Sequence, residues 1–306
     1  MNYIESTAET AFRKARGFYH VYSKPLEIDL LYRNDEELKI IINLIALSIM
    51  ISRCRILAFA IMSNHIHFIL EGPESACTEF VNSLLEKLGN YYRHNGRGRV
   101  TDSIQFSCAH IEDLRQLRAE IAYVIRNPFV VRTDVNLFAC PMTSGHLYFN
   151  PFLKREGVPA DSLKGRALRD FTRTRKDVEL SSEIYVLDGV AQAWSFVDYE
   201  RTMSFFDNAR QFIMCAVKSV EAQIEVALRY NESVLLNDQE LFSVAMKIAR
   251  ESFKCEKLSD LGRQELSLLA LELKNRYRIS NAQISRVCRI PRGDVDAMFP
   301  MASQNE

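Results

Sequence analysis

The sequence predicts an α+β fold, in which an antiparallel sheet with flanking helices is followed by an all-helical C-terminal region. Apolar strand-like runs alternate with amphipathic helical stretches over roughly the first 130 residues. Two of the runs, Arg55–Met62 and Ile66–Glu71, are separated by Ser63 and Asn64 within a short turn, which indicates a hairpin. From about residue 195 onward the apolar spacing is helical.

The first region follows a β-α-β-β-α-β-α order. The helix that begins near Asp35 has a possible cap in Asn34 and acidic residues in its first turn. Pro128 is predicted to end the last helix. The predicted strands are Gly17–Ser23, Arg55–Met62, Ile66–Glu71 and Ser103–Ile111, and the predicted helices are Asp35–Ile51, Thr78–Tyr92 and Asp113–Asn127.

The C-terminal region reads as a series of helices. Ser280 with Gln283 forms a capping-box pattern, and Pro291 is placed to open a last helix that runs to Phe299. Residues from about 260 to 300 therefore predict a helix-turn-helix, with a generic helical hairpin as the alternative. The helices before it are Tyr199–Asn231, Asn237–Phe253 and Gln264–Tyr277, and the first helix of the motif is Ala282–Val287.

The composition of the chain indicates which classes of protein it can belong to. The chain has 306 residues, with 39 basic and 39 acidic side chains, so overall charge neither indicates nor excludes a nucleic-acid partner. Seven cysteines without a CxxC pair indicate reduced thiols rather than a disulfide scaffold or a zinc site. The most apolar stretch, residues 40–62, is interrupted by Asn43, Arg53 and Arg55, so we expect no membrane span and a cytoplasmic location.

Two motifs carry chemistry. In the segment MSNHIHFIL, His65 and His67 stand two residues apart, so on a strand both imidazoles point to one face and can hold a divalent ion. Tyr123 and Asn127 stand four residues apart on one helix face, where a hydroxyl nucleophile and an amide oxygen ligand would lie together. Taken alone, each motif is more typical of ordinary packing on a half-buried strand or helix.

Together the two motifs resemble the single-tyrosine HUH transposases, in particular the REP-associated tyrosine transposases and their insertion-sequence relatives. The opening strand GFYHVYS and the helix start RNDEEL are also similar to that family, and the resemblance covers roughly residues 15–130. The chain departs from the family after Asn127-Pro128, where GHLYFNPF replaces a tryptophan-containing segment. The resemblance implies an HUH catalytic domain over residues 1–135. The composition and spacing of the residues that follow predict an aromatic and basic connector over 136–195 and a helical region over 196–306.

The resemblance also implies a reaction. Tyr123 would be the nucleophile, His65 and His67 would be metal ligands, and Asn127 matches the third ligand, with Mg²⁺ or Mn²⁺ as the cofactor. The enzyme would cut and rejoin single-stranded or hairpin-flanked DNA through a 5′-phosphotyrosine, as a transposase or a domesticated relative. The other histidines of the chain, His20 among them, are assigned no role. A single copy and a homodimer are both compatible with this assignment.

The C-terminal region is expected to bind duplex DNA. Arg286, Arg289 and Arg292 lie in or beside the predicted helix-turn-helix and are the candidates for phosphate or base contacts. The basic stretch Lys154–Lys176 could follow a phosphate backbone, and a solvated connector explains it equally well.

Two rival functions share these residues. A DNA-binding regulator could keep the fold without cutting, although the presence of His65, His67, Tyr123 and Asn127 favours an enzyme. A plasmid-type replication initiator would use the same histidine pair, but the single candidate tyrosine favours the transposase branch.

Overall fold

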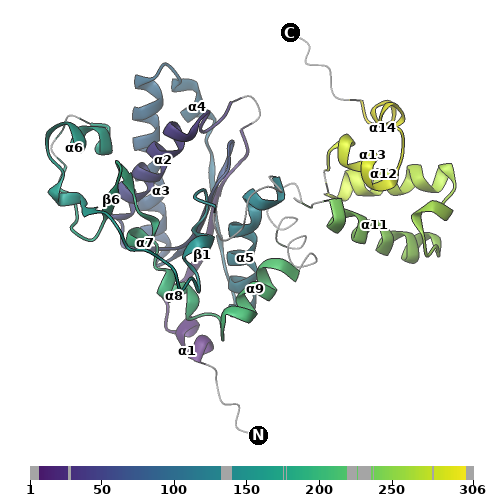
Figure 1. Cartoon of the computed structure of the whole chain (residues 1–306), viewed down its shortest axis with the longest axis horizontal. Coiled ribbons are helices and arrows are strands. Elements are labelled where there is room, and N and C mark those ends of the chain that lie inside the picture. Colours follow the sequence, from purple (N-terminus) through teal and green to yellow (C-terminus); the bar gives the residue numbers. More distant parts are fainter. Residues whose placement is uncertain are drawn as a thin grey trace, which may run out of the picture. The chain divides into compact units, whose positions relative to one another are not determined.

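The computed structural model describes residues 7–26, 29–131, 140–174, 176, 178–218, 226, 236, 238–277 and 279–300. The chain forms two compact units (Figure 1). The first comprises Met1–Phe129 with Asp134–Ala216, and the second comprises Val130–Thr133 with Val217–Glu306. The segment predicted as a connector therefore groups with the sheet. The three-domain division that the resemblance implies stays a prediction.

A four-stranded sheet organises the first unit. Its strands are β1 (Phe18–Ser23), β2 (Arg55–Ile61), β3 (Ile66–Glu71) and β4 (Phe106–His110), in the order β2-β3-β1-β4. Every neighbouring pair is antiparallel, which confirms the predicted fold class. Because β1 lies between β3 and β4, residues of the first strand meet the strand of the histidine motif directly, with Tyr22 opposite His67.

Helices cover both faces of this sheet, as Figure 1 shows. On one face Phe68 of β3 packs edge-on against Phe80 of α3, with ring centroids 5.0 Å apart. On the other face His67 meets Tyr123 of α5, with ring centroids 5.8 Å apart. The helices of this part are α1 (Thr7–Arg13), α2 (Asp35–Ile49), α3 (Glu74–His94), α4 (Gly98–Ser103) and α5 (Leu114–Val131).

Helix boundaries are where the sequence-based prediction was wrong. Helix α3 begins at Glu74, directly after Pro73, rather than at Thr78. Helix α5 continues through Pro128 to Val131, although proline removes one hydrogen bond of the helix and disfavours helical backbone before it. The buried face of α5, with Ile121 and Val124 fully enclosed, gains enough from packing to carry the helix past the proline.

The segment after residue 140 completes the first unit by covering β2, which is an edge strand of the sheet. The amide of Ile61 donates to the carbonyl of Met142 at 2.8 Å, and the amide of Phe59 donates to the Ser144 hydroxyl at 3.0 Å. The Tyr148 hydroxyl donates to the carbonyl of Leu57 at 2.6 Å. The segment from Met142 to Tyr148 thus satisfies backbone groups that an open edge would leave exposed.

A second, smaller sheet packs on α2. Its strands are β5 (Val158–Pro159), β6 (Tyr185–Leu187) and β7 (Val190–Ala191), in the order β5-β6-β7. The side chain of Asn43, buried in α2, donates to the carbonyl of Gly189 at 2.8 Å and accepts from the amide of Ala191 at 2.7 Å. The polar residue that interrupts the apolar run of α2 therefore anchors this hairpin.

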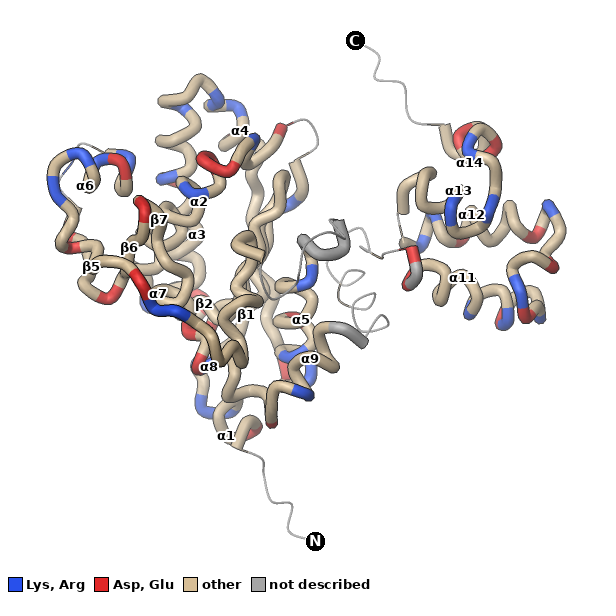
Figure 2. The backbone as a smooth tube through the Cα atoms, viewed as in Figure 1, with Lys and Arg blue, Asp and Glu red and all other residues tan. Residues whose placement is uncertain are grey.

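Short helices complete the first unit, namely η1 (Ser144–Leu147), η2 (Ala160–Ser162), α6 (Gly165–Thr172), α7 (Ala193–Phe196), α8 (Tyr199–Met203) and α9 (Ala209–Lys218). The predicted helix Tyr199–Asn231 is interrupted between α8 and α9, where Phe205 and Phe206 are buried in a turn. Its end lies outside the described residues. Basic and acidic residues are interspersed around α6 (Figure 2), as in the ion pair of Arg166 with Asp170 at 3.4 Å.

The second unit is helical, as predicted. Among its described residues are α11 (Asp238–Phe253), η3 (Leu258–Asp260), α12 (Arg263–Tyr277), α13 (Asn281–Cys288) and α14 (Arg292–Met298). Ser280 caps α13 by accepting from the amide of Gln283 at 3.2 Å, whereas the Gln283 side chain donates to the carbonyl of Leu236 instead of closing the capping box. The capping assigned to Asn237 lies outside the described residues.

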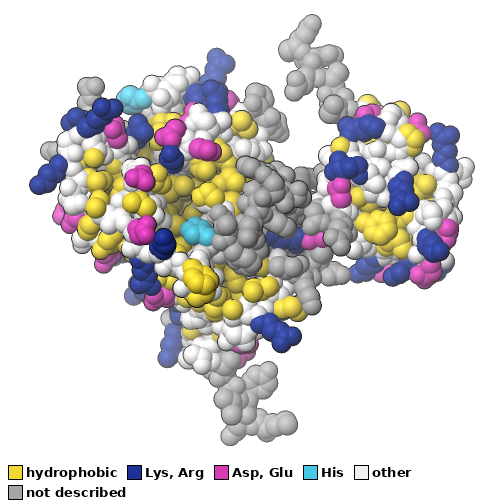
Figure 3. All heavy atoms as spheres, viewed as in Figure 1, with side chains coloured by type: hydrophobic (Ala, Val, Ile, Leu, Met, Phe, Trp, Pro, Cys, Tyr) yellow, Lys and Arg dark blue, Asp and Glu magenta, His cyan; other side chains and the backbone are white. Residues whose placement is uncertain are grey.

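Buried Asn281 joins the last three helices of this unit. Its amide nitrogen donates to Asp296 at 2.9 Å and to the carbonyl of Phe299 at 2.8 Å, and its oxygen accepts from Lys274 at 2.8 Å. On the face that Figure 3 shows, Lys and Arg side chains are dispersed around a hydrophobic patch rather than gathered together.

Within the described part of the chain, no helix has the length and apolar character needed to cross a membrane. All seven cysteines are free thiols.

Candidate functional site

The two histidines of the HIH motif lie side by side at the start of β3. His65 immediately precedes the strand and His67 lies within it, and their ring centroids are 4.8 Å apart. The Nδ1 of His65 lies 2.7 Å from the Oδ1 of Asn64. An amide oxygen can only accept, so this nitrogen carries the proton and Nε2 of the neutral ring keeps its lone pair. His65 thus offers one nitrogen as a metal ligand.

A third histidine, His20 of β1, contacts His67 from the neighbouring strand. Its Nε2 lies 3.1 Å from the Nδ1 of His67, and its Nδ1 lies 3.3 Å from Oε2 of Glu120 on α5. Gln116 donates to the other carboxylate oxygen of Glu120 at 2.7 Å. His20, His67 and Glu120 have no solvent exposure, so these four side chains form a buried polar chain that leads to His67.

Tyr123 reaches the same cluster from α5. Its ring centroid lies 5.8 Å from that of His67 and 6.1 Å from that of His20. The tyrosine is only 3% exposed. Asn127 follows one turn later and is also buried, and its Nδ2 has no hydrogen-bond partner among the residues that the structure describes. The structure therefore brings His65, His67 and Tyr123 together and places Asn127 on the same helix, on the side of Tyr123.

Burial controls the charge of the cluster. Loss of solvent, and then the proximity of His20, hold the pKa of His67 well below its usual range. A neutral imidazole is the form that binds a metal ion. Burial also lowers the pKa of Arg126, the residue just before Asn127.

The side chains predicted to hold a divalent ion are two imidazoles, of His65 and His67, and the amide oxygen of Asn127. Within the described ranges, no group of three or more His, Cys, Asp or Glu side chains is arranged to hold a metal. The predicted set contains two histidines and an asparagine, so it falls outside such a group. Asn127 would bind a metal ion through its amide oxygen, so the lack of a described partner for its Nδ2 does not bear on metal binding.

The three arginines predicted to bind DNA lie on the second unit. Arg286 forms two bonds to Asp238, at 2.6 and 3.0 Å, and Arg292 pairs with Asp296 at 2.8 Å. Arg289 is exposed at the turn after α13, with a left-handed φ of 55°. Two of the three guanidinium groups are thus held by carboxylates of their own unit.

The sequence analysis missed His20 and Glu120. The signal was present, because His20 stands two residues before Tyr22 and Glu120 three residues before Tyr123. Strand alternation places His20 on the face of Tyr22, which pairs with His67, and helical spacing places Glu120 beside Tyr123. What the sequence alone does not give is that β1 lies between β3 and β4.

Comparisons with known proteins give little beyond this geometry. No protein-family model matches the chain. No curated protein matches it either. A solved structure of a REP-associated tyrosine transposase bound to a REP hairpin is similar to 44% of this chain and 79% of that chain, with 15% sequence identity and a TM-score of 0.32. A likeness of this size carries no argument about function.

Proposed function

We propose that the chain is a metal-dependent single-strand DNA endonuclease and strand transferase that acts through a 5′-phosphotyrosine, as a transposase or a domesticated relative. The observation that carries the proposal is the convergence of Tyr123 with His65 and His67. These groups come from a helix and a strand far apart in the sequence. Their residue types are those that the HUH resemblance requires, and burial, followed by the proximity of His20, lowers the pKa of His67 so that the neutral imidazole is favoured.

In this proposal Tyr123 performs the covalent step. Its hydroxyl oxygen attacks a backbone phosphorus, the bond from phosphorus to the 3′ oxygen breaks, and the proton lost by the tyrosine is balanced by one gained by the leaving 3′-hydroxyl. A new 3′-hydroxyl can attack the phosphotyrosine in the reverse sense, which frees Tyr123 and joins two strands without another energy source. His65, His67 and Asn127 would hold Mg²⁺ or Mn²⁺, which polarises the scissile phosphate.

His20 and Glu120 are positioning residues in the same proposal. Nδ1 of His20 lies 3.3 Å from Oε2 of Glu120, so a proton on this nitrogen would face the carboxylate and leave Nε2 of His20 to accept from Nδ1 of His67. This arrangement leaves the Nε2 of His67 with a lone pair, ready for a metal ion. Carboxylate groups that orient a metal-binding histidine in this way are common around metal sites.

The second unit would deliver the enzyme to duplex DNA. Helices α12, α13 and α14 follow one another through short turns, and α14 begins at Arg292, as a helix-turn-helix requires. A helix of this kind enters the major groove, about 12 Å wide in B-form DNA. The partner proposed for the whole chain is therefore DNA, with a single strand or hairpin flank at the tyrosine and a duplex at the helical unit.

The experiment that tests the reaction is capture of the covalent intermediate. Single strands labelled at the 5′ flank and the 3′ flank of a hairpin are incubated with the protein and Mn²⁺, and adducts are resolved on denaturing gels. Tyr123→Phe removes only the hydroxyl and should abolish the adduct, while Tyr22→Phe, which also alters a tyrosine that stacks on His67, should retain it. An undiminished adduct in Tyr123→Phe rules out this nucleophile.

A non-catalytic DNA-binding regulator is the second candidate, favoured by the burial of Tyr123. An attacking hydroxyl has to reach a phosphate, and a side chain that is 3% exposed does so only after its surroundings move. Wild-type protein that binds the hairpin substrate and never forms an adduct would establish this second function.

A further inference from the structure

A basic pocket of about 400 Å³ lies at the opposite end of the sheet from the histidines. Five cationic side chains and a single carboxylate line it. They come from the segment before β1, the start of β2, the end of β3 and α8. The lining residues are Lys14, Ala15, Arg16, Arg53, Arg55, Glu71, Gly72, Pro73 and Arg201. The chain as a whole carries no net charge, so this excess of cations is local.

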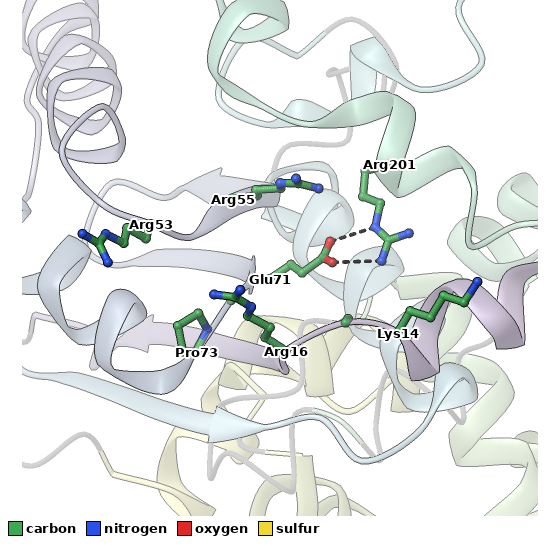
Figure 4. Close-up of a pocket in the computed structure, with 9 residues that line it drawn as sticks. Lys14, Arg16, Arg53, Arg55, Glu71, Pro73 and Arg201 are labelled. Atoms are coloured by element: carbon green, nitrogen blue, oxygen red, sulfur yellow. Dashed lines mark hydrogen bonds and ion pairs between the residues drawn. The ribbon is translucent and has the colours of Figure 1, made fainter.

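Internal ion pairs account for only two of the five cations. Arg201 binds both oxygens of Glu71, at 2.8 and 2.9 Å, and Arg55 lies 3.5 Å from Asp198. Figure 4 shows Arg201 reaching Glu71, with Arg55 and Arg16 on either side of that carboxylate. The side chains of Lys14, Arg16 and Arg53 have no carboxylate partner among the described residues, and all three are exposed.

The pocket is preformed. Arg201 is fixed by Glu71, by the carbonyl of Ala11 at 2.9 Å and by the ring of Phe205 at 4.7 Å. The backbone of Gly72, with a φ of 156°, donates to the carbonyl of Gly17 at 3.0 Å. A side chain at Gly72 would meet the Cβ of Cys54 at 2.9 Å, so glycine is needed for the strands to approach there. A fixed floor with exposed cations at its rim suits an anion with several oxygens.

We propose that this pocket binds a backbone phosphate of the DNA on which the enzyme acts, away from the scissile phosphate. That the anion belongs to DNA rests on the proposed function, whereas the presence of an anion site does not. Strand β3 connects the two places. From His65 to Glu71 the chain spans about 20 Å, which corresponds to roughly six nucleotides at the B-form rise per strand. An unpaired strand can be more extended than B-form DNA, so the flank that occupies both places is one long enough to span about 20 Å.

The test uses the full-length chain. The triple variant Lys14→Gln, Arg16→Gln and Arg53→Gln removes the three uncompensated charges and leaves Arg201 and Glu71 in place. The control variant, Arg93→Gln with Arg99→Gln and Arg115→Gln, removes three exposed charges on α3, α4 and α5. Affinity for a labelled hairpin with a ten-nucleotide flank is measured by fluorescence anisotropy over a series of salt concentrations, after circular dichroism has shown that both variants fold.

We expect the pocket variant to lose roughly tenfold in DNA affinity at low salt and its log–log salt slope to fall by about one unit, as the loss of one phosphate contact requires. The control should stay close to wild type. With a single strand too short to span about 20 Å, the rate of adduct formation should be the same in the pocket variant and in wild type. If both variants lost DNA affinity equally, the loss would follow from the change in net charge alone, and the proposal would be overturned.

Two further results separate the possible failures. If wild type forms the tyrosine adduct and the pocket variant binds DNA normally, the pocket inference fails and the proposed function stands. If wild type forms no adduct and the pocket variant still loses DNA affinity, the proposed reaction fails and the phosphate site stands. Titration with inorganic phosphate tests whether the pocket binds a small phosphate ligand instead of DNA. Tight binding of inorganic phosphate that has no effect on DNA affinity would overturn the assignment to DNA.

Discussion

The two ends of the central sheet differ in their electrostatic environment, although the same strands form both ends. At one end of β3, His67 is fully buried against His20, Glu120 and Tyr123, and its pKa is lowered by that burial. At the other end, Glu71 closes an open pocket with five cationic side chains around it. The difference lies in solvent access, since neutral groups tolerate burial and unpaired cations stay charged only where water reaches them.

This contrast suggests a division of labour. The buried end is suited to chemistry, which needs fixed tautomers and close contacts between a nucleophile and its neighbours. The open end is suited to holding a charged polymer, which needs long cationic side chains that adapt to it. Substitutions at the buried end should therefore affect reaction and metal binding, and those at the open end should affect DNA affinity and its dependence on salt.

The largest expected effect is that of removing a metal ligand. His67→Ala should abolish adduct formation, and wild type should lose the reaction in EDTA and regain it with Mg²⁺ or Mn²⁺. DNA affinity should change little in the same variant, because the basic pocket is intact. His94→Ala, at an exposed histidine of α3, provides the control. Cleavage that is indifferent to chelator would end the metal hypothesis.

A smaller effect is expected from Glu120→Gln. The substitution keeps the shape of the side chain but removes the charge that selects the tautomer of His20, so Mn²⁺ affinity should fall by about 10-fold to 100-fold. Electron paramagnetic resonance of free Mn²⁺ measures this without any turnover. Glu112→Gln, at an exposed carboxylate before α5, should bind Mn²⁺ as wild type does. Unchanged Mn²⁺ affinity in Glu120→Gln would show that His20 and Glu120 have only a structural role.

The smallest effect is expected at single arginines of the second unit. Arg289→Gly keeps the left-handed backbone of the turn and should flatten the log–log salt dependence of duplex binding by about one unit. Arg286→Ala and Arg292→Ala should each do less, because their guanidinium groups are already engaged by Asp238 and Asp296. The measurement is the affinity for duplex DNA over a series of salt concentrations. If all three variants matched wild type, the second unit would not bind duplex DNA through these arginines.

The sequence alone determined the strands, the helical character of the second unit and the shared face of His65 and His67. These features depend on alternation and helical spacing, which are local. The sequence also placed Tyr123 and Asn127 on one helix face, and it indicated the cap at Ser280 that the structure shows. The position of β1 between β3 and β4 was not accessible in this way.

Only the tertiary structure decided the surroundings of these residues. The chain from Gln116 through Glu120 and His20 to His67 needs a helix and two strands to meet, and the basic pocket gathers Lys14, Arg53 and Arg201 from distant segments. Packing of α5 also carried the helix past Pro128, against its local preference. In each case burial and long-range contacts, which no local pattern encodes, outweighed or completed what the residues favour by themselves.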